Sequence, residues 1–439
     1  MSGTLSSGNV CTKLQRIAEM AREHPERVFR SIHHVIDIAW LREAYRRTRK
    51  DGASGVDGQT AAEYAANLED NLQSLLDRFK SGSYRAPAVR RVHIPKGDGR
   101  KTRPIGIPTF EDKVLQRAVT MVLTAIYEQD FMDGSYGFRP GRSAHDALQA
   151  LRGELMSMSG GWVLEVDVVS FFDTLDHQHL RRFLDRRVTD GVIRRVVHKW
   201  LHAGILDSGQ LSYPESGSPQ GGVVSPILAN IYLHEVVDVW FEREVKPRLF
   251  GRCRLIRYAD DLVMVFEQER DARRVMDVLP KRFGKYGLSL HPEKTRLVCF
   301  ERPRGSGGKT RNERPDSFDL LGFTHYWAKS RRGYRVVMRR TASNRLSGAL
   351  RRVWQWCKEY RHWPVGYQRD MLAAKLRGHC GYYGLPGNGP ALNTFREGVI
   401  RAWRYWLGRR GGKRVMSWAR FSALRKHYPL PQVCMVRFA

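Results

Sequence analysis

The chain has 439 residues, of which 42% are hydrophobic and 27% charged, and its formal net charge is +30. This length exceeds that of one small domain, so we expect two or three domains with packed cores. No apolar run approaches the roughly 18 residues of a membrane span, and the N-terminus lacks the apolar core of a secretion signal, which disfavours membrane and secreted proteins. The six cysteines form no CxxC pair, which argues against a zinc ribbon or a disulfide framework and favours a reducing, cytoplasmic environment.

The first half of the chain alternates helical and strand patterns around glycine-rich loops. Helical periodicity covers 12–50, and 60–81 is expected to be one helix that closes at Gly82. Residues 88–108 alternate apolar and basic side chains around a Gly-Asp-Gly turn, which predicts a β-hairpin. Further elements are expected at 111–129 (helix), 162–172 (strand and turn) and 176–206 (helix).

The second half is predicted to contain a second hairpin and then basic helices. A Pro/Gly loop leads into a long apolar helix within 216–238, and 255–266 has the pattern of a β-hairpin. The elements expected next are a helix near 269–285, a strand at 295–300, a polar linker at 301–317 and a strand at 318–327. From there to the end the chain is expected to be basic and helical. This succession predicts an α+β region to about residue 325, followed by a separate helical domain.

Residues 331–439 carry +21 of the net charge of +30, with 24 lysines and arginines against 3 acidic residues. The same segment holds six of the eleven tryptophans, and we expect about half of these six to be core residues. A basic face of this kind can be a solvated surface, a membrane-binding patch or a nucleic-acid footprint. Arginine interleaved with aromatic residues favours nucleic acid, because phosphates attract the charge and bases stack on the rings.

The segment GSGGKT at 305–310 ends like a phosphate-binding loop. That loop requires a glycine at position 303, where this chain has Pro303, and it requires a buried strand before it and a helix after it. We therefore interpret the segment as a flexible basic loop rather than a nucleoside triphosphate site.

Three aspartates stand at the ends of predicted strands. Asp260 and Asp261 occupy the tip of the hairpin RYADDLVMVF, and Asp167 follows the strand WVLEV. A pair of aspartates in an ordinary hairpin turn is common. If the two strands are neighbours in one sheet, the three carboxylates converge at one edge, and hard oxygen ligands of this kind suit Mg²⁺. Two such ions would activate a 3′-hydroxyl and stabilise a leaving pyrophosphate.

The motif YADD at 258–261 is similar to the signature of reverse transcriptases, and the blocks around it resemble those of the group II intron-encoded reverse transcriptases, also called maturases. One of these blocks, IPKGDGRKTRPIGIP at 94–108, resembles the hairpin of their fingers. The others, in chain order, are GASGVDGQT, SYGFRPGRSAHDAL, VDVVSFFDTLDH, SPQGGVVSPILANIYL, GLSLHPEKT and FDLLGF. The resemblance covers the chain from about residue 40 to residue 439.

This resemblance implies a right-hand polymerase fold, in which fingers and palm are followed by an α-helical thumb, often called the maturase or X domain. The family's metal ligands fall on Asp167, Asp260 and Asp261, and the backbone carbonyl of Val168 would add a further oxygen. Two Mg²⁺ ions are implied, and Mn²⁺ could substitute for them.

Five other positions match residues that handle the nucleotide in this family. Phe172 would be the aromatic gate that excludes a ribose 2′-hydroxyl, and its alternative is a plain core phenylalanine. Lys96 and Arg103 flank the fingers turn and would clamp the triphosphate, Arg103 through bidentate geometry. Gln220 would lie against the nucleotide. Lys294 would donate a proton to pyrophosphate, and its alternative is a solvated surface lysine.

Three domains are expected from the resemblance: 1–85 as the N-terminal extension and start of the fingers, 86–325 as fingers and palm, and 330–439 as the basic thumb. Residues from about 396 could instead form a short DNA-binding extension, and the sequence does not separate these two readings. Many relatives append an HNH-type endonuclease with cysteine pairs. No such pairs precede Ala439, so target cleavage by this chain is not expected.

The implied function is that of an RNA-directed DNA polymerase that binds a group II intron RNA, assists its splicing and supports its mobility. Its partners would be the intron RNA, an RNA template with a DNA primer, target DNA and dNTPs, with no membrane partner; no oligomeric state is indicated. Two alternatives stay open: a domesticated relative serving host DNA repair or defence, and a non-catalytic RNA-binding splicing factor. The intact aspartates argue against the second alternative.

Overall fold

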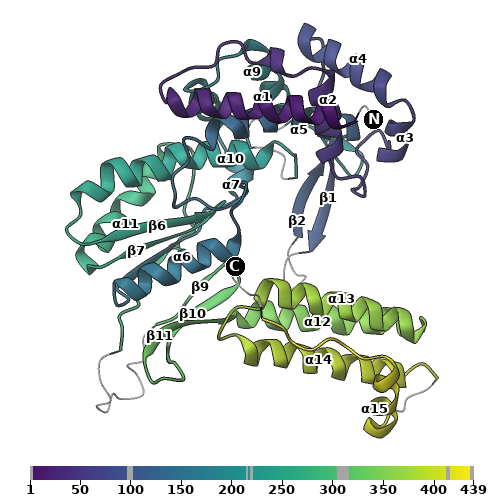
Figure 1. Ribbon diagram of the computed structural model, residues 1–439. Helices are drawn as coiled ribbons and strands as arrows, with labels where there is room; N and C mark the ends of the chain where they lie inside the picture. Colours follow the sequence, from purple (N-terminus) through teal and green to yellow (C-terminus); the bar gives the residue numbers. More distant parts are fainter. Residues whose placement is uncertain are drawn as a thin grey trace. The chain divides into compact units, whose positions relative to one another are not determined.

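The computed structural model describes residues 3–95, 102–213, 216–217, 221–303, 316–411 and 416–435 (Figure 1). The chain divides into two compact units. The first is built from residues up to Leu297, and the second from Val298 onwards together with Leu155–Gly160. None of the helices that the structure describes combines the length and apolar composition needed to cross a membrane.

The first unit is rich in helices that pack around one hydrophobic core. Helix α5 lies at the centre of this core, against α1 and α2, and its Ala118 carbonyl accepts a hydrogen bond from the Trp40 indole at 3.0 Å. The helices of this part of the chain are α1 (Gly3–Glu23), α2 (Ile38–Arg47), α3 (Ala61–Ala66), α4 (Leu68–Ser81), α5 (Phe110–Tyr127), α6 (Ala144–Ser157), α7 (Phe171–Thr174), α8 (His177–Asp185), α9 (Gly191–Leu201), α10 (Ser225–Leu233) and α11 (Glu269–Gly284). Short 3₁₀ turns cover His33–Val35 and Lys246–Arg248, and π-helical turns at His234–Asp238 and Phe241–Val245 extend α10.

Two predicted long helices are each divided in the structure. The segment predicted as one helix over 60–81 is split at Asn67, which leaves the helical conformation (φ −124°, ψ 47°), and α4 then ends before Gly82 as expected. The segment 176–206 is split between α8 and α9. Asp190 begins α9 there, because its buried carboxylate accepts hydrogen bonds from the backbone N–H groups of Val192 and Ile193 at 2.9 and 3.0 Å.

Two four-stranded sheets belong to this part of the chain. The first has the order β2-β1-β4-β5, and its antiparallel pair β1/β2 is the hairpin predicted over 88–108. The second has the order β6-β7-β3-β8, and helix α11 packs against its strands β3 and β7. The strand bounds are β1 (Val89–Pro95), β2 (Thr102–Ile107), β3 (Trp162–Val166), β4 (Ile205–Asp207), β5 (Gln210–Ser212), β6 (Cys253–Tyr258), β7 (Asp261–Phe266) and β8 (Arg296–Cys299).

The second unit combines a three-stranded antiparallel sheet with a group of helices. The sheet has the order β11-β10-β9, and α12 and α14 lie side by side over much of their length (Figure 1). The buried indole of Trp403 donates to the Gln368 side chain at 3.0 Å inside the helical core. The elements are β9 (Phe318–Leu320), β10 (Phe323–Lys329), β11 (Arg335–Thr341), α12 (Ser343–Glu359), α13 (Val365–Tyr383), α14 (Gly389–Gly408) and α15 (Trp418–His427).

The strands β9–β11 belong with the helices that follow them. Asn388 accepts a hydrogen bond from the Thr341 backbone at 2.8 Å, and the Tyr382 hydroxyl donates to the Leu321 carbonyl at 2.8 Å. The compact units divide at 297/298, whereas the boundary near 325–330 that the sequence predicts separates fingers and palm from thumb and stays a prediction. The expectation of helix throughout 328–439 was wrong for β11, where arginines stand on both faces of the strand (Arg335 and Arg339 on one, Arg340 on the other) and hide its period.

Candidate active site

The register of the second sheet places the predicted carboxylates at one edge. Strands β3 and β7 run antiparallel with Val166 opposite Leu262, so Asp167 directly follows β3 where Asp261 begins β7. Strands β6 and β7 form the predicted hairpin, which closes at the pair Tyr258–Asp261 and leaves Asp260 in its turn. The expectation that these strands are neighbours is confirmed.

The backbone beside these aspartates adopts conformations that are uncommon for residues with a side chain. Ala259 in the hairpin turn has φ 57°, and Ser170, three residues after Asp167, has φ 45°. Such left-handed positions cost about 1–3 kcal/mol and persist where the surroundings impose them, often at functional sites. Gly137 contributes to this constraint, since a Cβ on it would stand 2.3 Å from the Ala259 nitrogen.

A buried arginine holds the turn from inside. The Arg257 side chain is fully buried and forms a bidentate ion pair with Asp238, with Nη2···Oδ2 and Nε···Oδ1 distances of 2.6 and 2.9 Å. It also donates to Ser135 Oγ at 2.8 Å, to Asn230 Oδ1 at 2.9 Å and to the Ala259 carbonyl at 3.1 Å. The sequence patterns above do not predict this role. The available signal was an arginine inside an otherwise apolar buried strand, where a charge requires partners.

Asp167 is paired with Lys294 at this edge. Lys294 Nζ lies 2.5 Å from Asp167 Oδ2, and the Lys294 side chain is 63% exposed. The backbone carbonyl of Asp167 accepts from the His291 N–H at 2.8 Å, and Val168 bridges to Leu290, so the segment before β8 runs beside Asp167. Among the residues that the structure describes, no three His, Cys, Asp or Glu side chains are grouped so as to hold a metal ion. The backbone brings the carboxylates to one edge without closing them into a preformed cage.

Phe172 lies in α7, five residues after Asp167. Its ring stands nearly perpendicular to that of Phe171, with centroids 5.3 Å apart. Phe171 is buried in the core, whereas Phe172 is only half-buried. Of the two phenylalanines, Phe171 is therefore the core residue, and Phe172 packs against that core while part of its side chain stays accessible.

The fingers hairpin and the SPQGG loop are partly described. Arg103 is an exposed residue of β2, opposite Ile94, while Lys96 and Gln220 lie outside the described residues. Gly221, directly after Gln220, has φ 116°, and a Cβ on it would stand 2.6 Å from the Gly106 carbonyl oxygen of β2. Only glycine allows this approach, which sets the loop against the strand that carries Arg103.

Comparison with known proteins identifies the family. Residues 94–325, which include all three aspartates, match the family model described as reverse transcriptase (RNA-dependent DNA polymerase). The chain belongs to the reverse transcriptase family. This reverse transcriptase is 38% identical over 329 residues to protein YkfC of Escherichia coli K12, covering 66% of this chain and 84% of YkfC.

The reverse transcriptase is also similar to an intron-encoded protein and to an intron maturase. It is 37% identical over 287 residues to the group II intron-encoded protein LtrA of Lactococcus lactis subsp. cremoris, covering 61% of this chain and 46% of LtrA. It is 27% identical over 216 residues to the mitochondrial nuclear intron maturase 2 of Arabidopsis thaliana, covering 39% of this chain and 29% of that protein. The reverse transcriptase thus matches less than half the length of LtrA. These relatives confirm its resemblance to group II intron-encoded proteins.

Proposed function

We propose that this reverse transcriptase is an RNA-directed DNA polymerase of the group II intron type, with its catalytic centre at Asp167, Asp260 and Asp261. The observation that carries the proposal is the antiparallel register of β3 and β7, which brings a carboxylate after one strand to the carboxylates before the other. The alternative of a splicing factor without polymerase activity does not require this arrangement.

The donor set at this edge fits Mg²⁺, because carboxylates and a backbone carbonyl are hard oxygen ligands. Asp167, Asp260, Asp261 and the carbonyl of Val168 would hold two ions, and Mn²⁺ could replace Mg²⁺. When bound, the ions would favour deprotonation of the primer 3′-hydroxyl and neutralise charge on the leaving pyrophosphate. Rotation of the Asp167 carboxylate away from Lys294 would free it as a ligand and leave the ammonium beside the phosphates as a proton donor.

Other residues would select and hold the nucleotide. The half-buried ring of Phe172 would close the space next to the sugar and offer a ribose 2′-hydroxyl no hydrogen bond, so that dNTPs are preferred. The exposed guanidinium of Arg103, together with Lys96, would bind the triphosphate by charge-assisted hydrogen bonds. Gln220 would lie against the nucleotide, next to the close approach of Gly221 to β2.

The second unit would bind RNA as thumb and maturase domain. Three of its six tryptophans after residue 331, Trp354, Trp363 and Trp418, are exposed among arginines, which supports a surface for phosphates and bases. We propose group II intron RNA, a primed RNA template and target DNA as partners, splicing assistance and intron mobility as the wider role, and the cytoplasm as the location. We retain 1–85, 86–325 and 330–439 as extension, fingers-palm and thumb, with the segment from about 396 open to a DNA-binding role.

Primer extension tests the polymerase. With an RNA template, an annealed DNA primer, dNTPs and Mg²⁺, the wild-type protein should extend the primer to the end of the template. A separate assay follows splicing of the RNA that flanks the gene, with and without protein, at low Mg²⁺. Extension together with faster splicing supports the full proposal. Extension without any effect on splicing favours the host-repair or defence alternative.

A further inference from the structure

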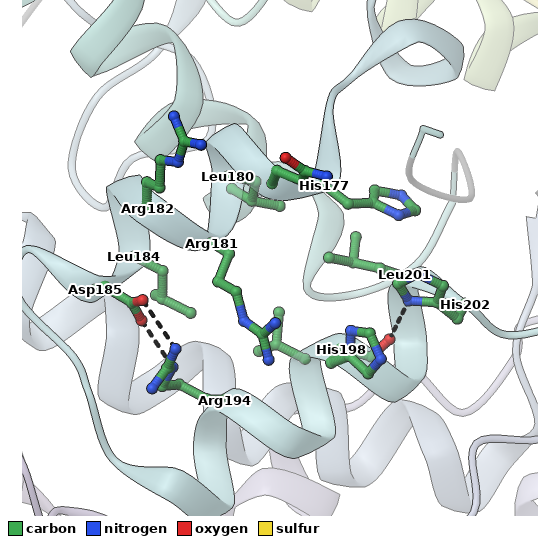
Figure 2. A pocket seen from close by; sticks show the side chains of 12 residues that line it. His177, Leu180, Arg181, Arg182, Leu184, Asp185, Arg194, His198, Leu201 and His202 are labelled. Atoms are coloured by element: carbon green, nitrogen blue, oxygen red, sulfur yellow. Dashed lines mark hydrogen bonds and ion pairs between the residues drawn. The ribbon is translucent and has the colours of Figure 1, made fainter. Parts of the chain in front are cut away.

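A cavity of about 260 Å³ lies between α8 and α9 in the first unit (Figure 2). Its floor is apolar and includes Leu180, Leu184 and Leu201. Its walls carry cationic or basic groups, with Arg181 reaching from α8 towards α9 and His198 and His202 standing at the end of α9 (Figure 2). This combination of an apolar floor and basic walls is not part of the site described above.

The basic groups of the cavity lie close together. The rings of His198 and His202 have centroids 4.1 Å apart, and those of His177 and His202 are 4.8 Å apart. Burial lowers the pKa of His198 below its ordinary value, and His202, Arg181 and His177 lower it further. Of the acids near this cavity, Asp185 is paired with Arg194 at 2.8 Å, and Asp176 caps α8 by accepting a hydrogen bond from the His179 N–H at 2.7 Å.

Arg181 has no hydrogen-bond or ion-pair partner within the part of the chain that the structure describes. Its guanidinium is exposed at the cavity, and it adds to the positive potential at His198. A bound anion would form charge-assisted hydrogen bonds with this guanidinium and offset its positive potential. Because the Asp185 carboxylate of the lining is paired with Arg194, the guanidinium of Arg181 favours an anion from outside the chain.

The size and chemistry of the cavity limit its occupant. Pockets for drug-sized ligands are usually about 300–1,000 Å³, so a cavity of about 260 Å³ suits one small group rather than a nucleoside triphosphate. Flat bases stack on imidazole rings and on guanidinium planes, and unpaired bases of RNA are commonly held in this way. An acidic peptide would match the charge but would leave the leucine floor and the imidazole faces unused.

We propose that this cavity binds one unpaired nucleotide of a single-stranded RNA, with its phosphate at Arg181 and its base against the imidazoles of His198 and His202. The proposal rests on the proposed function only in that RNA is the polymer this protein meets. The cavity is joined to the loop before the SPQGG glycines, because the His177 Nε2–H donates to the Gly217 carbonyl at 2.5 Å. Gly217 in turn donates to the Leu175 carbonyl at 2.8 Å, just after α7. RNA held here would lie beside elements that also support the catalytic edge.

Photo-cross-linking locates the RNA. A single-stranded oligoribonucleotide of about 12 nucleotides, within the site sizes of single-strand binding proteins, carries one 4-thiouridine and is irradiated with the full-length protein. We expect cross-links to map by mass spectrometry to His198, His202 or Arg181, in addition to any in the second unit. Cross-links confined to other segments would overturn the proposal.

Matched variants test the same cavity in solution. Arg181→Gln with His198→Ala should weaken binding of this oligonucleotide about 3- to 10-fold and lower the salt slope by about one. Arg195→Gln is the control, because Arg195 is an exposed arginine of α9 outside the cavity lining and its replacement removes the same charge. Equal effects of the two variants on affinity and slope contradict the proposal. Binding of labelled polyglutamate, without binding of RNA, would indicate that the cavity binds an acidic peptide instead.

Two measurements separate loss of RNA binding at the cavity from misfolding and from loss of polymerase activity. Thermal unfolding shows whether the double variant Arg181→Gln with His198→Ala is folded. If it is not, His202→Ala alone is tested in its place, and we expect the same loss of cross-linking. Primer extension on a short pre-annealed template should be unchanged in the cavity variants. Absence of extension by the wild-type protein would refute the polymerase, whereas absence of cross-links to the cavity residues of the wild-type protein, with intact extension, would refute only the cavity.

Discussion

Arg257 and Asp238 form a buried ion pair whose arginine also supports the hairpin turn that carries Asp260 and Asp261, the proposed catalytic carboxylates. Their side chains are 0% and 1% exposed, and the shorter of their two hydrogen bonds is 2.6 Å. The same guanidinium donates to the carbonyl of Ala259, the residue before Asp260. The geometry of the carboxylates is thereby linked to the packing of the helices beneath the sheet.

Arg257→Met should destabilise the fold strongly. It leaves the Asp238 carboxylate buried without its cation, and breaking a buried pair in this way costs about 3–5 kcal/mol. Urea unfolding followed by circular dichroism measures the decrease in the free energy of unfolding. A change below about 1 kcal/mol, the range of exposed ion pairs, would contradict the buried role.

Arg257→Met combined with Asp238→Leu separates stability from positioning. Replacing both charges by apolar groups often restores stability, so we expect the double variant to regain most of the free energy of unfolding. Polymerase activity should remain low, because the Ala259 carbonyl still lacks its donor. Wild-type activity in the stable double variant would show that the turn does not depend on Arg257.

Phe172→Ala should raise ribonucleotide incorporation relative to deoxyribonucleotide incorporation by about 10- to 100-fold, as expected when a pocket loses steric exclusion of one small group. Competition between each dNTP and its rNTP in primer extension gives the ratio. Phe171→Leu is the control: Phe171 is buried, so its substitution should reduce stability and leave sugar selectivity alone. Unchanged selectivity in Phe172→Ala would assign Phe172 to packing.

Lys294→Ala should slow the chemical step by about 10²-fold, the lower range for removal of a general acid. Its surface ion pair with Asp167 contributes at most about 1 kcal/mol to stability, so the unfolding midpoint should hardly move. Single-turnover nucleotide addition gives the rate, and Lys281→Ala, at another exposed lysine, is the control. A rate equal to that of the control would make Lys294 a solvated surface residue.

Exposed arginines of the second unit should set much of the salt dependence of RNA binding. Arg331, Arg332 and Arg352 are exposed, and we expect their joint replacement by glutamine to flatten the plot of log K against log salt. The slope should fall by about one for each phosphate that the variant no longer neutralises. Fluorescence anisotropy over a series of KCl concentrations measures the slope. An unchanged slope would place the RNA footprint elsewhere.

Local patterns predicted strands β3, β6 and β7 because the determinants of these strands are local. Apolar runs interrupted by two aspartates define the β6/β7 hairpin, and WVLEV defines β3, whereas their pairing follows only from the folded sheet. The buried role of Arg257 depends on Asp238, Asn230 and Ser135, which are 19, 27 and 122 residues away. The periodicity of a short segment does not predict hydrogen-bond partners that lie so far away in the sequence.

In the second unit, sequence patterns failed to predict one strand and the unit to which a small sheet belongs. Its strand β11 was hidden by arginines on both faces, although Arg339 is buried in the structure. Whether β9–β11 join the preceding sheet or the following helices is decided by contacts such as Asn388 with Thr341, which lie 47 residues apart. The boundary at 297/298 is therefore a property of tertiary packing.

Primer extension by Asp260→Ala with Asp261→Ala is the most direct test of the catalytic edge. We expect cDNA synthesis to fall by at least about 10³-fold, with RNA binding within about twofold of wild type, because the carboxylates act on the reaction and not on the RNA footprint. Asp173→Ala, which removes an exposed aspartate of α7, should retain activity. Extension by the double variant at the wild-type rate would contradict the assignment of this hairpin as the polymerase centre.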